Sequence, residues 1–255
     1  MKEIKLNQEI NYIHLLSGGL DSTYSLLSRV KELKEKEPPI IIQPIFFDYG
    51  HKAAKIEWAR VRKIAKYICS FFNNKSLIAN PLKISLRSNL FTWSKSDAFK
   101  GKKGEKNPEI ENRNMVLFSV LASYLIACAN NQKIKSTTFE ITSGFKEKEL
   151  PDSKSAFFEK IKDLLRMYNI ERKHPKDLKF NFQILEGMGR QTIIDETKKL
   201  LNDDETKWEK LRGLMTSCYD PSDSGDPCSE CSKCKLLSNE RMESVEYRIQ
   251  KRFST

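Results

Sequence analysis

Long hydrophobic runs are few in this chain of 255 residues. The longest mostly apolar stretch, Met115–Ala129, is too short for an ordinary membrane-spanning helix and is interrupted by Ser119, Ser123 and Tyr124. The N-terminus also lacks a basic flank, a long apolar region and a small-residue cleavage site, so we expect no signal peptide. We therefore expect a cytoplasmic protein that does not associate with membranes, with Met115–Ala129 as a buried helix.

Negative charge is in short supply. The chain has 34 acidic residues against 45 Lys and Arg, which gives a formal net charge of +11. An excess of this sign suggests an anionic partner, which could be nucleic acid, a membrane surface or a nucleotide triphosphate. Much of it can equally be solvated helix surface, as in Lys31–Glu37, where both signs interleave. Charge alone does not choose among these possibilities.

Short β-type runs alternate with helical periodicity along most of the chain. This pattern predicts an α/β fold, a doubly wound parallel sheet covered by helices. The expected strands cover residues 12–16, 40–47, 75–84, 134–142 and 180–185. The expected helices cover residues 21–36, 53–72, 112–129, 155–169 and 192–201. Ser94–Pro108, which has five lysines and little apolar content, is expected to be a mobile surface loop.

A glycine-rich turn lies between the first expected strand and the helix that follows it. At such a helix start, unpaired backbone N–H groups and the helix dipole favour an anion, and glycines let the backbone approach it closely. An ordinary glycine turn with Asp21 or Ser22 as helix cap is the alternative reading. The residues of this turn that would hold the anion are Ser17, Gly18, Gly19, Leu20, Asp21, Ser22 and Thr23.

The complete string of the turn resembles the SGGxDS signature of the PP-loop family. Members of that family break ATP between the α and β phosphates and pass through an adenylated substrate. The turn lacks the lysine of the GxxxxGK[ST] loop, which serves transfer of the γ phosphate. The resemblance implies catalytic roles for Ser17, Asp21 and Ser22, with Mg²⁺ bridging the ATP phosphates and Asp21 contributing to its hydration shell.

Four of the six cysteines lie close together near the C-terminus, among turn residues. In a reducing compartment such a cluster indicates metal binding, because four thiolates can surround one zinc ion tetrahedrally. An iron–sulfur cluster also takes four thiolates and remains the alternative. Cys69 and Cys128 lie in expected helices and are read as core residues. The expected metal ligands are Cys218, Cys228, Cys231 and Cys234.

The phosphate loop and the cysteines together resemble the 7-cyano-7-deazaguanine synthase family, the QueC-like branch of the PP-loop enzymes. The likeness extends from Ile13 to about Leu237. It implies an adenine nucleotide alpha hydrolase-like domain over residues 1–210 and a zinc-binding segment over residues 211–255. Further matching segments are Phe47–Gly50 (FDYG), Arg113-Asn114 (the end of PGRN), Ile141–Gly144, Pro151-Asp152 (within YPDC) and Ser217–Tyr219.

The resemblance implies a reaction in two rounds. Adenylation of 7-carboxy-7-deazaguanine lets ammonia displace AMP to give an amide, and adenylation of the amide oxygen then permits loss of AMP to form the nitrile. Positioning and charge stabilisation carry this chemistry, so no nucleophilic side chain is required. The implied nucleotide contacts also include Asp48, Tyr49 and Gly50. The implied substrate contacts are His51, Arg113, Asn114 and Asp152, with Arg113 also catalytic.

Two of these residues also have an ordinary structural interpretation. A histidine at a helix start, such as His51, is often only a polar cap. Without its motif, Arg113 would be read as a surface arginine, although its guanidinium could pair bidentately with a carboxylate or phosphate. His14 is expected to be a satisfied core residue in the first strand.

The match is weaker on the substrate side than on the ATP side. The family's YGQRH is replaced by Tyr49–Ala53, its PGRN by Glu111–Asn114 and its YPDC by Leu150–Ser153. The chain could therefore belong to a divergent branch of the family, such as the QueC-like proteins of antiphage systems. An enzyme of that branch would stop at the amide or transfer the acyl group to a protein amine. A tRNA-modifying PP-loop enzyme and a degenerate scaffold are further alternatives. We expect a deazaguanine acid and ammonia as partners, no tight tRNA binding, and a homodimer or a protein acceptor as open possibilities.

Overall fold

The computed structural model describes residues 4–36, 40–74, 77–86, 113–146, 154–170, 177–231 and 234. Five parallel strands form one sheet in the order β3-β2-β1-β4-β5. The strands are β1 (Ile10–Leu15), β2 (Ile42–Asp48), β3 (Leu82–Ser85), β4 (Ser136–Lys146) and β5 (Asp177–Leu185). The described helices are α1 (Leu20–Leu33), α2 (Ala54–Phe71), α3 (Arg113–Asn131), α4 (Ser155–Ile170), α5 (Arg190–Leu200) and α6 (Glu205–Leu214).

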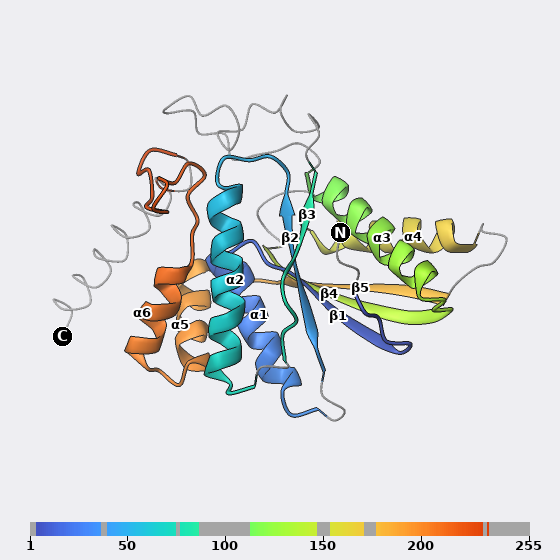
Figure 1. The fold of residues 1–255 in the computed structure, drawn as a ribbon, viewed down its shortest axis with the longest axis horizontal. Helices are drawn as coiled ribbons and strands as arrows, with labels where there is room; N and C mark the ends of the chain where they lie inside the picture. Colours follow the sequence, from blue (N-terminus) through green and yellow to red (C-terminus); the bar gives the residue numbers. More distant parts are fainter. Residues whose placement is uncertain are drawn as a thin grey trace.

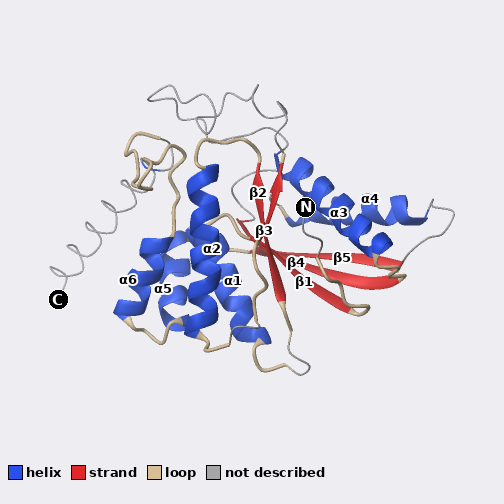
Figure 2. Ribbon diagram, viewed as in Figure 1, coloured by secondary structure: helices blue, strands red, loops and turns tan. Residues whose placement is uncertain are grey.

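Helices cover both faces of the sheet. In Figure 1, α3 and α4 lie on one side and α1, α2, α5 and α6 on the other. Figure 2 shows the same two groups of helices flanking the strands. Successive side chains of a strand point to opposite faces. Accordingly, Ile13 and Leu15 of β1 belong to the core beside α3, while Tyr12 belongs to the core beside α1. The expected α/β fold with a doubly wound parallel sheet is confirmed.

The strand order places a ligand site. From β1 the chain continues outward on one side through β2 and β3, and on the other through β4 and β5, so the order reverses between β1 and β4. Open parallel sheets bind ligands beyond the carboxyl ends of their strands at this switch point. Ser17–Gly19 follow β1 there, and Gly144 lies on neighbouring β4. The fold therefore places the glycine-rich turn at the expected ligand position.

Helix α3 is the described helix that is long and apolar enough to cross a membrane by length and composition. Half of that stretch is buried inside the molecule. Leu117, Leu121 and Leu125, one helical turn apart, belong to the core on one face of the sheet. The expected buried helix is therefore confirmed, and its apolarity is explained by the sheet that it covers.

Each strand and helix expected from the sequence is present, but several bounds differ. Strand β3 covers only Leu82–Ser85, because the preceding residues contribute just one isolated bridge, between Ile42 and Ile78. Helix α6 was not expected. Its N-cap Asp204 accepts a hydrogen bond from the Lys207 N–H at 3.1 Å, and Trp208 and Leu211 bury its inner face. The expected loop 94–108 and Asp152 lie outside the described residues, and the division after residue 210, which falls within α6, stays a prediction.

Candidate nucleotide site and cysteine cluster

The turn after β1 is held in one conformation by its own hydroxyl groups. The Ser17 and Ser22 Oγ atoms lie 3.0 Å apart, and the Gly19 N–H donates to Ser17 Oγ at 3.4 Å. Ser22 Oγ donates to the Gly19 carbonyl at 3.2 Å. Gly19 is the N-cap of α1, and no described side chain caps that helix, so N–H groups of its first turn stay available for an anion.

Two glycines make this arrangement possible. Gly18 has φ +84°, a left-handed conformation that other residues adopt only with strain. Gly144 of β4 lies against the first turn of α1, where an added β-carbon would be only 2.3 Å from the Ser22 nitrogen. Any larger residue at 144 would push the strand and the helix start apart. The sequence match included Gly144 but gave it no role.

The remaining loop residues divide by exposure. Ser17 is exposed and Asp21 is partly exposed, so both can reach a ligand. Leu20 and Thr23 are buried, and Leu20 belongs to the core, so it can contribute only its backbone. The Thr23 hydroxyl has no hydrogen-bond partner among the residues that the structure describes. Among the predicted nucleotide-binding residues, Ser17 and Asp21 are thus more accessible to a ligand than the buried Leu20 and Thr23.

His14 connects three elements beneath the loop. Its Nε2 lies 2.8 Å from the Ser22 carbonyl oxygen, and its Nδ1 lies 2.6 Å from Thr142 Oγ1 on β4. Complete burial lowers the pKa of His14 to about 4, although the Ser22 hydrogen bond opposes the shift. The neutral ring donates from Nε2 and accepts the Thr142 hydroxyl at Nδ1. The expected satisfied core histidine is confirmed, and it anchors the helix start to the sheet.

The end of β2 presents a fixed carboxylate. Asp48 accepts the Gly50 N–H at 3.2 Å and Lys83 Nζ at 2.7 Å. Burial alone would raise the pKa of Asp48, but the Lys83 ammonium and the Gly50 N–H outweigh it and hold the pKa below its ordinary value. The sequence did not indicate Lys83, which reaches Asp48 because β3 pairs with β2 in parallel register. Asp48 is therefore ionised and already partnered.

His51 lies in a buried pair. Its Nε2 is 2.7 Å from Glu57 Oε2, and its ring stacks on Tyr49 with centroids 4.0 Å apart. The remaining ring nitrogen, Nδ1, is buried, and within the described part of the chain it has no hydrogen-bond partner. The sequence gave no signal for Glu57, whose role depends on the first turns of α2. His51 is thus held by Tyr49 and Glu57 rather than lying free as a simple surface cap.

Arg113 and Asn114 open α3 beside the same group. Arg113 Nε donates to Asn114 Oδ1 at 3.2 Å, and Asn114 is almost fully buried. Burial raises the pKa of Tyr49 to about 12, although the Arg113 guanidinium, hydrogen-bonded to the Tyr49 hydroxyl, opposes the shift. The fold therefore brings Tyr49, His51 and Arg113 together from two distant segments. Asp152 lies outside the described residues.

The cysteines form one compact cluster. The Sγ atoms of Cys218, Cys228, Cys231 and Cys234 all lie within 4.8 Å of one another. The Cys218 and Cys231 sulfurs are 3.9 Å apart, close to the roughly 3.8 Å edge of a tetrahedral zinc–thiolate site. Backbone N–H groups also donate to the sulfurs, including Cys228 N to Cys218 Sγ at 3.2 Å. The donor set fits a metal such as zinc, with all four positions filled by protein.

The other two cysteines are separate from this cluster. Cys128 is buried in the core helix α3, and Cys69 is partly buried against the core beside α2. Burial raises the pKa of the Cys69 thiol, which disfavours the reactive thiolate. Both positions agree with the reading as core residues.

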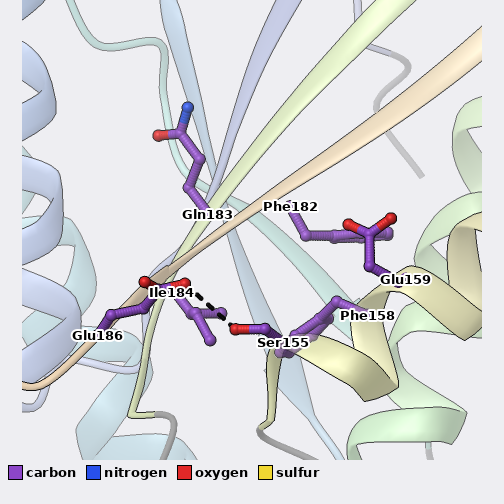
Figure 3. Close-up of a pocket in the computed structure, with 7 residues that line it drawn as sticks. All are labelled: Ser155, Phe158, Glu159, Phe182, Gln183, Ile184 and Glu186. Atoms are coloured by element: carbon purple, nitrogen blue, oxygen red, sulfur yellow. Dashed lines mark hydrogen bonds between the residues drawn. The ribbon is translucent and has the colours of Figure 1, made fainter.

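A cavity of about 410 Å³ lies between α4 and the end of β5, and its lining includes no residue of the glycine-rich turn. Figure 3 shows the Ser155 hydroxyl bonded to the Glu186 carboxylate at its edge, 3.1 Å apart, with Glu159 on the opposite wall. Two carboxylates disfavour a phosphate ligand, so we do not assign the nucleotide here. Its lining residues are Ser155, Phe158, Glu159, Phe182, Gln183, Ile184 and Glu186.

The strand order, the loop at the switch point and the helix that follows it define a PP-loop α/β fold with a C-terminal cysteine cluster. The sequence profile described as "Queuosine biosynthesis protein QueC" matches residues 11–243. The chain therefore belongs to the QueC family.

One relative with a described name is the 7-cyano-7-deazaguanine synthase of Sulfolobus acidocaldarius. It is 31% identical to this chain over 128 residues. The matched region covers 47% of this chain and 26% of that protein, so this chain spans about a quarter of the relative's length. No solved structure gives a significant match.

Proposed function

We propose that this protein is an ATP-dependent QueC-like synthase that adenylates 7-carboxy-7-deazaguanine and releases pyrophosphate. The observation that carries the proposal is the preorganised Ser17–Ser22 turn at the switch point of a QueC-family sheet. The name of the Sulfolobus relative supplies the substrate class.

In the first proposed step a carboxylate oxygen of the substrate attacks the α phosphorus of ATP and pyrophosphate leaves. The N–H groups at the start of α1 and the exposed Ser17 hydroxyl would hold the departing phosphates, and Asp21 would orient a hydrated Mg²⁺ ion. Magnesium, when bound, would neutralise part of the phosphate charge. These donors are fixed before the reaction, so little reorganisation opposes it.

In the second step ammonia attacks the acyl carbon and AMP leaves, which gives the amide. The amide oxygen then attacks a second ATP, and loss of AMP with the amide protons forms the nitrile. Arg113 would face the anionic groups of the substrate and the phosphates, and Tyr49 would contact the nucleotide. The two side chains are hydrogen-bonded to each other at the end of β2. The zinc expected on the four cysteines would stabilise the fold and would not contact the reacting groups, since it has no open position.

Transfer of the acyl group to a protein amine is the second candidate. It is favoured by the replaced substrate segment Tyr49–Ala53, in which His51 pairs with Glu57 and Lys52 with Asp220. Both side chains are therefore committed to partners within this chain. A change in the protein segment that surrounds the acyl group would leave the adenylation step intact, but it would alter which nucleophile reaches the adenylate.

The deciding experiment is mass spectrometry of products with ATP, Mg²⁺, ammonia and 7-carboxy-7-deazaguanine, with and without a candidate acceptor protein. Nitrile would support the synthase, and amide accumulation or a mass increase on the acceptor would support the second candidate. An Asp21→Asn variant serves as the matched control and should give none of these products. Adenylation of other acids, with 7-carboxy-7-deazaguanine ignored, would overturn both candidates.

A further inference from the structure

The segment that leads from α6 into the cysteines passes directly beside the glycine-rich turn. The Thr216 N–H donates to the Gly18 carbonyl at 2.9 Å. A β-carbon added to Gly19 would lie 3.5 Å from the Thr216 carbonyl oxygen and 3.9 Å from Ser217 Oγ. The C-terminal segment therefore forms one wall of the turn, although about two hundred residues separate them in sequence.

Contacts on both sides of Ser217 fix this wall. Arg60 Nη1 donates to the Gly213 carbonyl at 2.8 Å before it, and Lys52 Nζ lies 3.2 Å from Asp220 Oδ2 after it. Tyr219 packs with Tyr49 in a small apolar cluster. In Figure 1 the orange-red segment after α6 runs alongside α2 to the end of that helix that is nearer to β2. Ser217 is thus positioned by its neighbours on both sides.

The Ser217 hydroxyl itself is uncommitted. Ser217 is partly exposed and makes no hydrogen bond within the described part of the chain. Ser17 Oγ also lies close to Gly19, 3.5 Å from the β-carbon that would be added there, and Ser217 Oγ is 3.9 Å from the same point. Two serine hydroxyls from distant parts of the chain therefore lie near Gly19, the N-cap of α1. A hydroxyl can donate to any phosphate oxygen held there.

We propose that Ser217 is a ligand of the pyrophosphate half of ATP, contributed by the cysteine segment, and that metal on the adjacent Cys218 fixes its position. This inference rests on the proposed function and extends the same site. As the bond between the α and β phosphates breaks, negative charge grows on the departing pyrophosphate. A positioned hydroxyl donor stabilises that charge more than it stabilises bound ATP. The cysteine cluster would then serve catalysis through the wall that it holds.

The test measures binding of Mg-pyrophosphate, and separately of AMP, to the metal-loaded full chain by calorimetry. Loss of a hydrogen bond to a charged group should weaken pyrophosphate binding roughly tenfold in Ser217→Ala and leave AMP binding unchanged. Ser217→Thr keeps the hydroxyl and should stay within roughly twofold of the natural chain. Ser224→Ala, in the same segment but hydrogen-bonded to Asp226, is the matched control and should match the natural chain. Metal content is measured for every variant.

A second measurement needs no variant. Pyrophosphate should slow amide hydrogen exchange in a peptide spanning residues 213–220 as well as in one spanning 17–23, and AMP should not. Unchanged exchange at 213–220, or equal pyrophosphate affinity in Ser217→Ala, overturns the inference. If the natural chain releases AMP and pyrophosphate but one of these two outcomes is found, the proposed function stands and only the role of Ser217 is lost. A natural chain that binds no pyrophosphate and forms ADP overturns both.

Discussion

At the scale of single residues, the site depends on which groups are exposed and which are committed. Ser17 and Asp21 reach solvent, whereas His14 is enclosed and its two ring nitrogens are both used. His51 is also buried, and one of its ring nitrogens is held by Glu57. His14 is therefore a structural anchor of the loop. His51 is fixed at the end of β2, and its contact with substrate stays a prediction. The exposed loop groups are the ones that we expect to act on ATP.

Asp21→Asn and Ser17→Ala should each lower the rate of AMP and pyrophosphate release. Loss of one preorganised group that stabilises charge in a transition state costs roughly 100-fold or more. Nucleotide chromatography of the products measures the rate. Asp195→Asn, on the exposed face of α5, is the control and should keep full activity. Products limited to ADP and phosphate in the natural chain would contradict the PP-loop assignment.

His14 should make stability depend on pH. Its pKa is about 4 when folded and about 6.5 when unfolded, so between these values the unfolded state takes up a proton that the folded state refuses. Stability from His14 is therefore complete above pH 6.5 and is lost as the pH falls toward 4, by about 3 kcal/mol. Denaturant unfolding at pH 7, 5.5 and 4.5 measures this. His14→Gln should lose less stability over that range, and equal slopes for both proteins would refute the assignment.

At the scale of elements, close contacts between helices and strands determine the arrangement of the site more than the intrinsic propensities of the segments do. The first turn of α1 fits against β4 only because residue 144 has no side chain. Helix α6 packs with α2 and carries the chain to the cysteines, although its sequence is mostly polar. These contacts place the phosphate turn, the β2 end and the cysteine segment next to one another.

Gly144→Ala should therefore be strongly destabilising. The added carbon would lie 2.3 Å from the Ser22 nitrogen, which is backbone and cannot move aside cheaply. We expect a loss of about 2–4 kcal/mol in the free energy of unfolding, measured by denaturant titration. Gly213→Ala, in α6, meets no atom within 4 Å and should be neutral or slightly stabilising. Equal stability for the two variants would show that β4 and α1 are not in contact in solution.

The cysteine cluster should behave as a folding element. We expect one zinc ion per chain, and Cys231→Ser should lose both metal and folded protein, because binding of structural zinc contributes directly to folding free energy. Metal analysis and circular dichroism measure the two losses. Cys69→Ser, outside the cluster, should retain the metal. An iron–sulfur absorption band, or a stable metal-free protein, would count against structural zinc.

At the scale of the whole molecule, the positive charges behind the net charge of +11 are unevenly paired with carboxylates. The outer side of α2 exposes Lys55, Arg62, Lys63 and Lys66, and none of the four has an ion-pair partner among the described residues. Elsewhere many cations are paired with nearby carboxylates, as in Lys198 with Glu205. The α2 surface is thus where a nonspecific polyanion would bind first.

Binding of tRNA should accordingly be weak and should collapse between about 50 and 200 mM salt, as phosphate contacts release counterions. Fluorescence anisotropy with labelled tRNA measures it. A Lys63→Glu and Lys66→Glu double variant should reduce the low-salt binding further without affecting AMP release. Tight, sequence-selective binding at physiological salt would instead favour a tRNA-modifying enzyme.

The sequence by itself determined the alternation of strands and helices, the phosphate turn and the cysteine cluster. These features are local: hydrophobic periodicity sets the elements, and Ser17–Ser22 and Cys218–Cys234 each lie within one short stretch of chain. The bounds of the short β3 and the whole of helix α6 escaped the pattern because their packing partners, not their own periodicity, stabilise them.

Only the tertiary structure decided which distant residues share a site. Lys83 meets Asp48 through strand register, Glu57 meets His51 through the turn into α2, and Arg113 meets Tyr49 through the placement of α3. Likewise, Ser217 stands beside Gly19 because the chain returns to β1 after α6. Contacts of this kind join residues far apart in the chain, and they are fixed by how elements pack rather than by any spacing that a single sequence displays.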